Sequence, residues 1–133
     1  MIVVDTNILI YRIVDGDKTE KTLRLEDRDS DWKTSPLWQY EFGNALILMI
    51  RQRHLTPKAA IALFESAHSS FSPGETQPDL DLAFHLAAEK KITFYDAQYL
   101  TLAHSLKVPL ITEDRALRKS AGNAAMSLEE FLN

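Results

Sequence analysis

Residues 1–13 read MIVVDTNILIYRI, and this stretch decides the fold class. Three β-branched apolar residues, Ile2 to Val4, come before Asp5, and a helix-like pattern then runs to Val14. A short apolar run without a polar face is typical of a central strand in a parallel sheet, because helices cover such a strand on both sides. The stretch therefore predicts a buried strand followed at once by a helix, the first unit of an α/β domain.

Strands and helices alternate along the rest of the chain. We expect further strands at 32–34, 108–112 and 124–126, and helices at 6–14, 18–25, 36–53, 57–71, 80–90, 94–106 and 114–120, with a loop at 72–78 and a terminal turn. This alternation predicts a three-layer α/β/α domain with a mainly parallel central sheet of four to five strands. The length of 133 residues suits a single domain that spans 1–133.

The composition indicates a folded protein without thiol chemistry. The chain is 45% hydrophobic and has no Cys, which excludes disulfide scaffolds, thiol nucleophiles and Cys-ligated metals. Its net charge is −4, whereas proteins that coat nucleic acid are basic. The longest apolar run, residues 45–50, is too short to cross a bilayer, and we expect a soluble cytoplasmic protein. An anionic substrate would need a local source of positive charge.

Four acidic residues are expected near one edge of the predicted sheet. Asp5 directly follows the first strand, and Asp114 lies just past the late strand. Glu41 stands in the second turn of the helix after the second strand, and Asp96 stands in the first turn of a later helix. Ligands of such sheets bind beyond the carboxyl ends of the strands. The four side chains are therefore predicted to converge on one crevice.

The surroundings of Glu41 and Asp96 point to a metal site. Both stand among apolar neighbours, namely Trp38, Phe42, Ala45, Phe94, Ala97 and Leu100. A carboxylate on an apolar face is costly unless it is paired, hydrogen-bonded or metal-bound, and no Lys or Arg lies one helical turn away. Clustered carboxylates without His or Cys suit Mg²⁺ or Mn²⁺. Two such ions can bind a phosphodiester and activate water, so the pattern favours phosphodiester hydrolysis.

Each acid also has a simpler explanation. Asp5 and Asp114 stand where an N-cap of the following helix is expected, and Asp96 follows Thr93 at the spacing of a capping box. Glu41 can be a half-exposed surface residue. Taken singly, capping is the better explanation for the three Asp residues. Taken together with their flanking residues, the four acids favour a catalytic site.

Four blocks of the sequence resemble the PIN-domain ribonucleases, specifically the small VapC-type toxins of bacterial and archaeal toxin–antitoxin pairs. The blocks are VVDTNILI (3–10), YEFGNAL (40–46), TFYDAQYLTLA (93–103) and PLITEDRAL (109–117). Each block contains one of the four acids, and the resemblance covers essentially the whole chain. No single block is specific, but their order and placement match the family.

The resemblance implies a metal-dependent endoribonuclease with Asp5, Glu41, Asp96 and Asp114 as its acidic site. Asp5 and Asp96 would be the firmest Mg²⁺ ligands. Asn7 matches the DTN position and would hold the acids in place, and Thr112 matches the Ser or Thr before the last acid, where it would hydrogen-bond a carboxylate or water. Members of the family typically form homodimers, and an antitoxin silences them by covering the active-site groove.

The residues after Asp114 depart from the family pattern. The family often has a further acid there, whereas this chain continues with Arg115, Ala116, Leu117 and Arg118. A second metal site would then be weak or fill only with substrate. Arg115 and Arg12 each follow a strand-end acid within the next helix, so we expect these two cations to guide an RNA backbone, although ordinary surface charge explains either one alone.

Two other functions remain open at this point. A haloacid-dehalogenase-like phosphatase also begins with an Asp after its first strand, but that family needs a second Asp two residues later, where this chain has Asn7. A PIN-like module that only binds a partner is the other alternative, and the presence of all four acids argues against it.

Overall fold

A four-stranded parallel sheet lies at the centre of the computed structural model, which describes all of residues 1–133. In sheet order the strands are β2 (Trp32–Lys33), β1 (Ile2–Val4), β3 (Leu110–Ile111) and β4 (Ala125–Met126). The register places Val3 of β1 beside Lys33 on one side and Leu110 on the other. The predicted α/β class and parallel sheet are therefore confirmed, with four strands.

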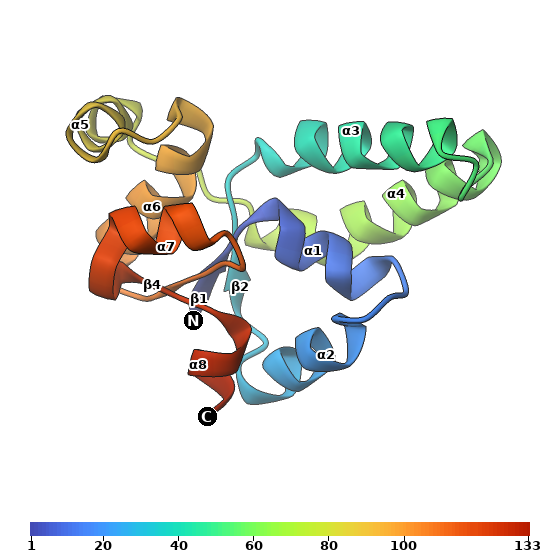
Figure 1. The fold of residues 1–133 in the computed structure, drawn as a ribbon, viewed down its shortest axis with the longest axis horizontal. Helices are drawn as coiled ribbons and strands as arrows, with labels where there is room; N and C mark the ends of the chain where they lie inside the picture. Colours follow the sequence, from blue (N-terminus) through green and yellow to red (C-terminus); the bar gives the residue numbers. More distant parts are fainter.

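Helices cover both faces of this sheet. They are α1 (Thr6–Ile13), α2 (Thr19–Arg28), α3 (Trp38–Arg51), α4 (Pro57–Phe71), α5 (Leu80–Lys90), α6 (Phe94–Leu106), α7 (Arg115–Ala121) and α8 (Leu128–Leu132), with short 3₁₀ turns η1 (Ser72–Gly74) and η2 (Gly122–Ala124). In Figure 1, α5, α6 and α7 lie to the left of the sheet, and α1, α3 and α4 lie to its right. This is the predicted three-layer arrangement. No helix has the length and the apolar character that crossing a membrane requires.

The first strand joins two separate hydrophobic cores. Ile2 and Val4 pack into a cluster with residues of α1, α3 and α4, whereas Val3 packs into a second cluster with residues of α6 and α7. Side chains of a strand alternate between its two faces, and here both faces are covered. This explains why all three residues of β1 are apolar and buried. It also fixes the position of Asp5, the next residue along the chain.

The start of α3 is fixed by aromatic packing. Trp38 is fully buried, stacks on Phe64 and makes edge contacts with Phe42 and Phe71. Its indole Nε1 donates a hydrogen bond of 2.8 Å to the Glu75 carboxylate. Large aromatic residues dominate the energetics of a core, and a buried indole N–H needs such an acceptor. The first turn of α3 is therefore held rigidly over the carboxyl edge of the sheet.

Several predicted boundaries are corrected. The helix predicted to follow Ser35 begins only at Trp38, because the Ser35 hydroxyl accepts the amide of Leu37 in a preceding turn. Glu41 consequently lies in the first turn of α3, not in its second. The late strand is shorter than 108–112. The predicted helix 18–25 extends to Arg28, whose guanidinium binds carbonyl oxygens of α8, and the predicted terminal turn is α8 itself.

The predicted loop 72–78 seals the outer edge of β2. Thr34 donates its amide to the Gly74 carbonyl (3.2 Å) and accepts the Thr76 amide (2.9 Å), which makes one isolated bridge to Glu75. A Cβ atom at Gly74 would lie 2.0 Å from the carbonyl oxygen of Trp32. Only glycine fits this close approach. The loop covers an edge that would otherwise be open to pairing with another strand.

Candidate active site

The four predicted acids line one pocket at the carboxyl edge of the sheet. Asp5 lies at the end of β1, Glu41 in α3, Asp96 in the first turn of α6, and Asp114 just before α7. The pocket has a volume of about 270 Å³, and its other lining residues come from α1, α3 and α6: Thr6, Asn7, Ile10, Asn44, Ala45, Leu48 and Tyr99. The fold thus brings together four segments that are far apart in the sequence.

Asp5 is the most constrained of the four acids. Its side chain is buried, and its Oδ1 accepts the amide of Ile8 (3.2 Å), which makes Asp5 the N-cap of α1. Its Oδ2 accepts a hydrogen bond of 2.5 Å from the Thr112 hydroxyl. That hydroxyl also accepts the Asp114 amide (3.1 Å). Thr112 therefore links the ends of β1 and β3, the place where it was expected to contact a carboxylate.

Glu41 is held by two hydroxyl groups that the sequence analysis did not single out. Its Oε1 accepts hydrogen bonds from Thr6 Oγ1 (2.9 Å) and from the hydroxyl of Tyr99 (2.5 Å), and the two hydroxyl oxygens lie 2.6 Å apart. Tyr99 follows Asp96 by three residues, so both point to the same side of α6. That spacing places Tyr99 beside Asp96, and the two hydrogen bonds identify Tyr99 and Thr6 as residues that orient Glu41.

Asp96 and Asp114 both combine a helix start with a place in the pocket. The amide of Asp96 is capped by Thr93 Oγ1 (3.0 Å), which leaves its carboxylate free to face the pocket. The carboxylate of the exposed Asp114 accepts the Leu117 amide (3.0 Å) as the N-cap of α7. Capping and a site role are therefore compatible here.

The remaining predicted site residues are divided between the pocket and other surfaces. Asn7 lines the pocket and is exposed, but its side chain makes no hydrogen bond to the acids. Arg12 pairs with Glu26 and lines a different pocket, so the structure does not bring it to the acids. Arg115 is exposed at the first position of α7, directly after Asp114.

Burial and mutual repulsion act on the carboxylates. Burial raises the pKa of Asp5 to about 6, and the nearby charges of Asp96 and Glu41 act in the same direction. Burial also raises the pKa of Asp96, and Asp114 and Glu41 add to that shift. The pKa of the Tyr99 hydroxyl is raised by burial and then by Glu41, so it remains a hydrogen-bond donor. The native fold therefore holds negative charge where it is electrostatically unfavourable.

No cation of the protein relieves this repulsion. The lining of the pocket contains no Lys or Arg, and none of the four acids takes part in an ion pair. Oxygen donors without a counter-charge are the donor set that Mg²⁺ and Mn²⁺ prefer. No three His, Asp or Glu side chains are arranged so that they alone hold a metal ion. The donor set thus fits an ion that keeps several waters or takes phosphate oxygens as further ligands.

A known protein family and two of its members resemble this chain over much of its length. The family model described as PIN domain matches residues 2–123. Exonuclease VapC9 of Pyrobaculum aerophilum is 40% identical over 78 residues, which are 59% of this chain and 58% of that protein. Ribonuclease VapC3 of the same organism is 28% identical over 119 residues, which are 87% of this chain and 91% of that protein.

A solved structure shares the fold. The crystal structure of PAE2754 from Pyrobaculum aerophilum matches with a TM-score of 0.77 and 28% identity, and the match covers 98% of this chain and 92% of that chain. The matched range 2–123 includes all four acids of the pocket and all of the sheet except β4. Sequence, fold and site therefore agree, and the chain belongs to the PIN-domain family.

Proposed function

We propose that the protein is a metal-dependent endoribonuclease and the toxin of a toxin–antitoxin pair. The observation that carries this proposal is the pocket of four carboxylates without a cation, two of them with raised pKa values. The names of two relatives, an exonuclease and a ribonuclease, support a nuclease. PIN-domain nucleases generally use divalent metals, which matches the donor set. The family also favours this function over the phosphatase alternative.

In this proposal Asp5 and Asp96 hold the ion, with Glu41 and Asp114 completing the acidic side. A bound Mg²⁺ or Mn²⁺ supplies the positive charge that attracts and polarises a phosphodiester in an acidic pocket. Thr112 orients Asp5, and Thr6 and Tyr99 orient Glu41. A carboxylate of the pocket accepts the proton of the attacking water, whose oxygen bonds to phosphorus as the leaving oxygen departs.

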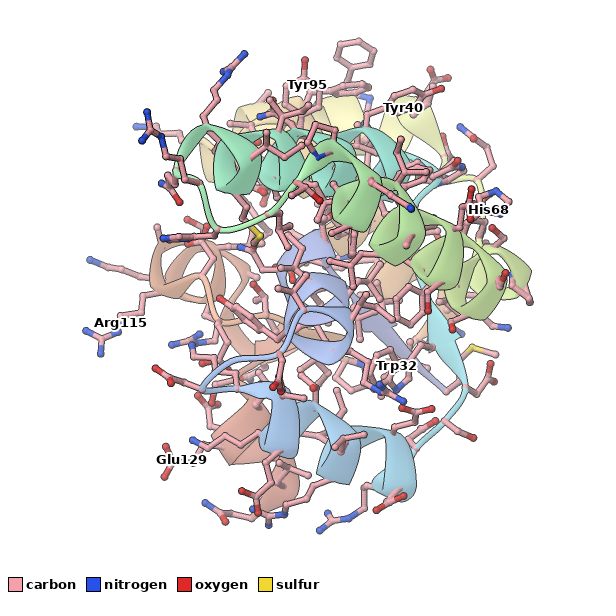
Figure 2. All side chains as sticks on the ribbon, turned by 90° about the vertical axis from the view of Figure 1, so that its right-hand side faces the viewer. Trp32, Tyr40, His68, Tyr95, Arg115 and Glu129 are labelled. Carbon is pink, nitrogen blue, oxygen red and sulfur yellow. The ribbon has the colours of Figure 1, made fainter.

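The RNA substrate, the antitoxin and the homodimer belong to the same proposal. Two exposed apolar surfaces support protein partners. One is a groove of about 310 Å³ between α3 and α4 that includes Ile47 and Ile61. The other is formed by the exposed Phe84 of α5, whose ring centroid lies 4.5 Å from that of Phe94 of α6. In Figure 2 two other exposed aromatic residues, Tyr95 and Tyr40, both lie towards the top of the molecule. Exposed apolar side chains of this size are typical of interaction surfaces.

Removal of metal tests the proposed reaction. The purified protein should cleave single-stranded RNA in Mg²⁺, lose that activity in EDTA and regain it when Mg²⁺ or Mn²⁺ is added back. The electrostatic reason is that the acids alone repel a phosphate. Gel analysis of end-labelled RNA is the measurement. Intact RNA in Mg²⁺, or cleavage that persists in EDTA, would exclude this function and leave the interaction module as the better explanation.

A Tyr99→Phe variant tests how Glu41 is positioned. We expect RNA cleavage to fall about tenfold, because a hydrogen bond to a charged group contributes roughly 1.5–3 kcal/mol and Thr6 still holds Glu41. The ring stays in the core, so the variant should fold, but the lost hydrogen bond should also lower the melting temperature by several degrees. Tyr40→Phe is the matched control, since Tyr40 is adjacent to Glu41 but 78% exposed. Equal activity of both variants would remove Tyr99 from the account.

A further inference from the structure

The wall of the acidic pocket continues along α3 towards the turn between α3 and α4. On α3 the pocket is lined by Glu41, Asn44, Ala45 and Leu48, a stripe with helical spacing. Arg51, the last residue of α3, follows Asn44 by seven residues and therefore lies two turns further along the same edge. At 1.5 Å per residue, Arg51 is about 15 Å beyond Glu41 along the helix axis. That span suits a few nucleotides of an extended strand.

The α3–α4 turn is a basic surface in an acidic protein. No Asp or Glu occurs between Glu41 and Glu65, whereas the chain as a whole has a net charge of −4. Arg51, Arg53 and Lys58 are exposed, and none of them makes an ion pair or a side-chain hydrogen bond. We refer to these three residues as the basic turn. Their charges are not used within the fold.

Two of these cations occupy positions that the backbone disfavours. Arg53 adopts a left-handed conformation with φ 62° just after α3, where glycine would avoid steric strain. Lys58 is the second residue of α4, at the end of the helix whose dipole repels a positive charge. Lys91 and Lys107 have the same left-handed conformation at the ends of α5 and α6, so the backbone alone does not mark a site. The grouping of three exposed cations without a counter-charge is what indicates a binding site for an anion outside the chain.

The basic turn and Arg115 lie on opposite sides of the sheet, because Figure 1 shows α7 at the left and the α3–α4 turn at the far right. In Figure 2 the loop between α3 and α4 lies at the upper left, and the side chain of Arg115 projects at the left below it. Arg115 directly follows Asp114, which lines the pocket. A polyanion that crosses the acids therefore has a cation on one flank and the basic turn on the other.

We propose that Arg51, Arg53 and Lys58 bind backbone phosphates of single-stranded RNA outside the cleaved bond. This inference rests on the proposed function, because it assigns a substrate contact to the same site. A basic groove that follows the backbone is how proteins bind single strands without reading their sequence. The contact adds affinity for the flanking strand and leaves the chemistry to the acidic pocket.

The test is a triple variant, Arg51→Gln, Arg53→Gly and Lys58→Gln, compared with the parent protein. Binding of a fluorescent single-stranded RNA is followed by anisotropy over a range of salt concentrations. The Kd should rise at least about tenfold at low salt, and the slope of log K against log salt should fall by about 2, since each lost phosphate contact on a single strand removes about 0.7. In cleavage assays KM should rise while kcat at saturating RNA stays unchanged.

Single variants separate binding from folding. Arg53→Gly should raise the melting temperature by about 3 °C, because glycine relieves the left-handed strain, yet it should weaken RNA binding. Lys107→Gly is the matched control. Lys107 has the same strained conformation, φ 59°, but precedes β3 and so lies at the edge of the sheet opposite the acids. It should gain stability without a change in RNA binding.

The outcomes distinguish this inference from the proposed function. A parent protein that neither binds nor cleaves single-stranded RNA would overturn the proposed function, and the inference with it. If the parent binds and cleaves RNA but the triple variant has the same Kd and salt slope, only the inference is wrong. Unchanged RNA binding together with lost binding of a polyglutamate peptide would assign the basic turn to an acidic protein partner, against the proposal.

Discussion

An Asp5→Asn variant is expected to lose RNA cleavage by about a thousandfold or more while its metal-free form becomes more stable. The loss follows because Asp5 is the most buried carboxylate of the pocket and one of the two proposed metal ligands. The gain follows from the pKa of Asp5, which burial raises to about 6. Holding this group ionised at pH 7 costs up to about 3 kcal/mol of the free energy of unfolding.

The pH dependence of the metal-free parent has a definite sign. Between about pH 4 and pH 6, native Asp5 keeps a proton that the unfolded chain has already released. The native state then binds more protons than the unfolded state, so the free energy of unfolding falls as the pH rises through this window. Above about pH 6 native Asp5 is also ionised, and the free energy of unfolding falls no further from this group. Asn at this position still accepts the Ile8 amide, and the variant should lack this part of the pH dependence.

Urea unfolding in EDTA at several pH values is the measurement, together with RNA cleavage in Mg²⁺. Asp27→Asn, at an exposed position in α2, is the matched control and should leave both stability and activity unchanged. An Asp5→Asn variant that cleaves RNA as well as the parent would show that the site is wrongly assigned. A variant less stable than the parent at pH 8 would show that the burial of a charge has been overestimated.

Binding of Mn²⁺ is expected to stabilise the parent strongly. An ion that binds only the native state adds about 2.7 kcal/mol at a free concentration of about one hundred times its Kd. Here the ion also removes the repulsion among Asp5, Asp96 and Glu41, so stabilisation should be greatest above about pH 6, where Asp5 is ionised. The melting temperature with and without Mn²⁺ measures the effect.

The Asp96→Asn variant is the control for this effect. It removes one proposed ligand, but the Thr93 cap on its amide remains. The variant should therefore fold and lose most of the stabilisation by Mn²⁺. An equal shift in the parent and in Asp96→Asn would show that Mn²⁺ binds elsewhere on this acidic protein.

The convergence of the acids was predictable because it follows from the topology. Asp5 and Asp114 each follow a strand, and parallel strands place their carboxyl ends at one edge of the sheet. The position of Asp96 was predictable for a different reason, because Thr93 marks the start of its helix and so places Asp96 in the first turn. These positions depend on local signals of strands and caps, which the sequence displays directly.

Other features depend on side-chain contacts that no local pattern encodes. Tyr99 and Thr6 reach Glu41 only through the packing of three elements, α1, α3 and α6, and their spacing in the sequence does not reveal that contact. Arg12 looked suitable because it follows Asp5 by two helical turns, but its side chain turns to Glu26 of α2. The extension of α2 likewise depends on contacts with α8 at the far end of the chain.

Anomalous diffraction from crystals grown with Mn²⁺ tests the proposed metal site in the acidic pocket most directly. A manganese peak is expected within coordination distance of carboxylate oxygens from both Asp5 and Asp96, at the carboxyl edge of the sheet. Manganese bound only at other acidic surfaces, with this pocket filled by water alone, would contradict this prediction.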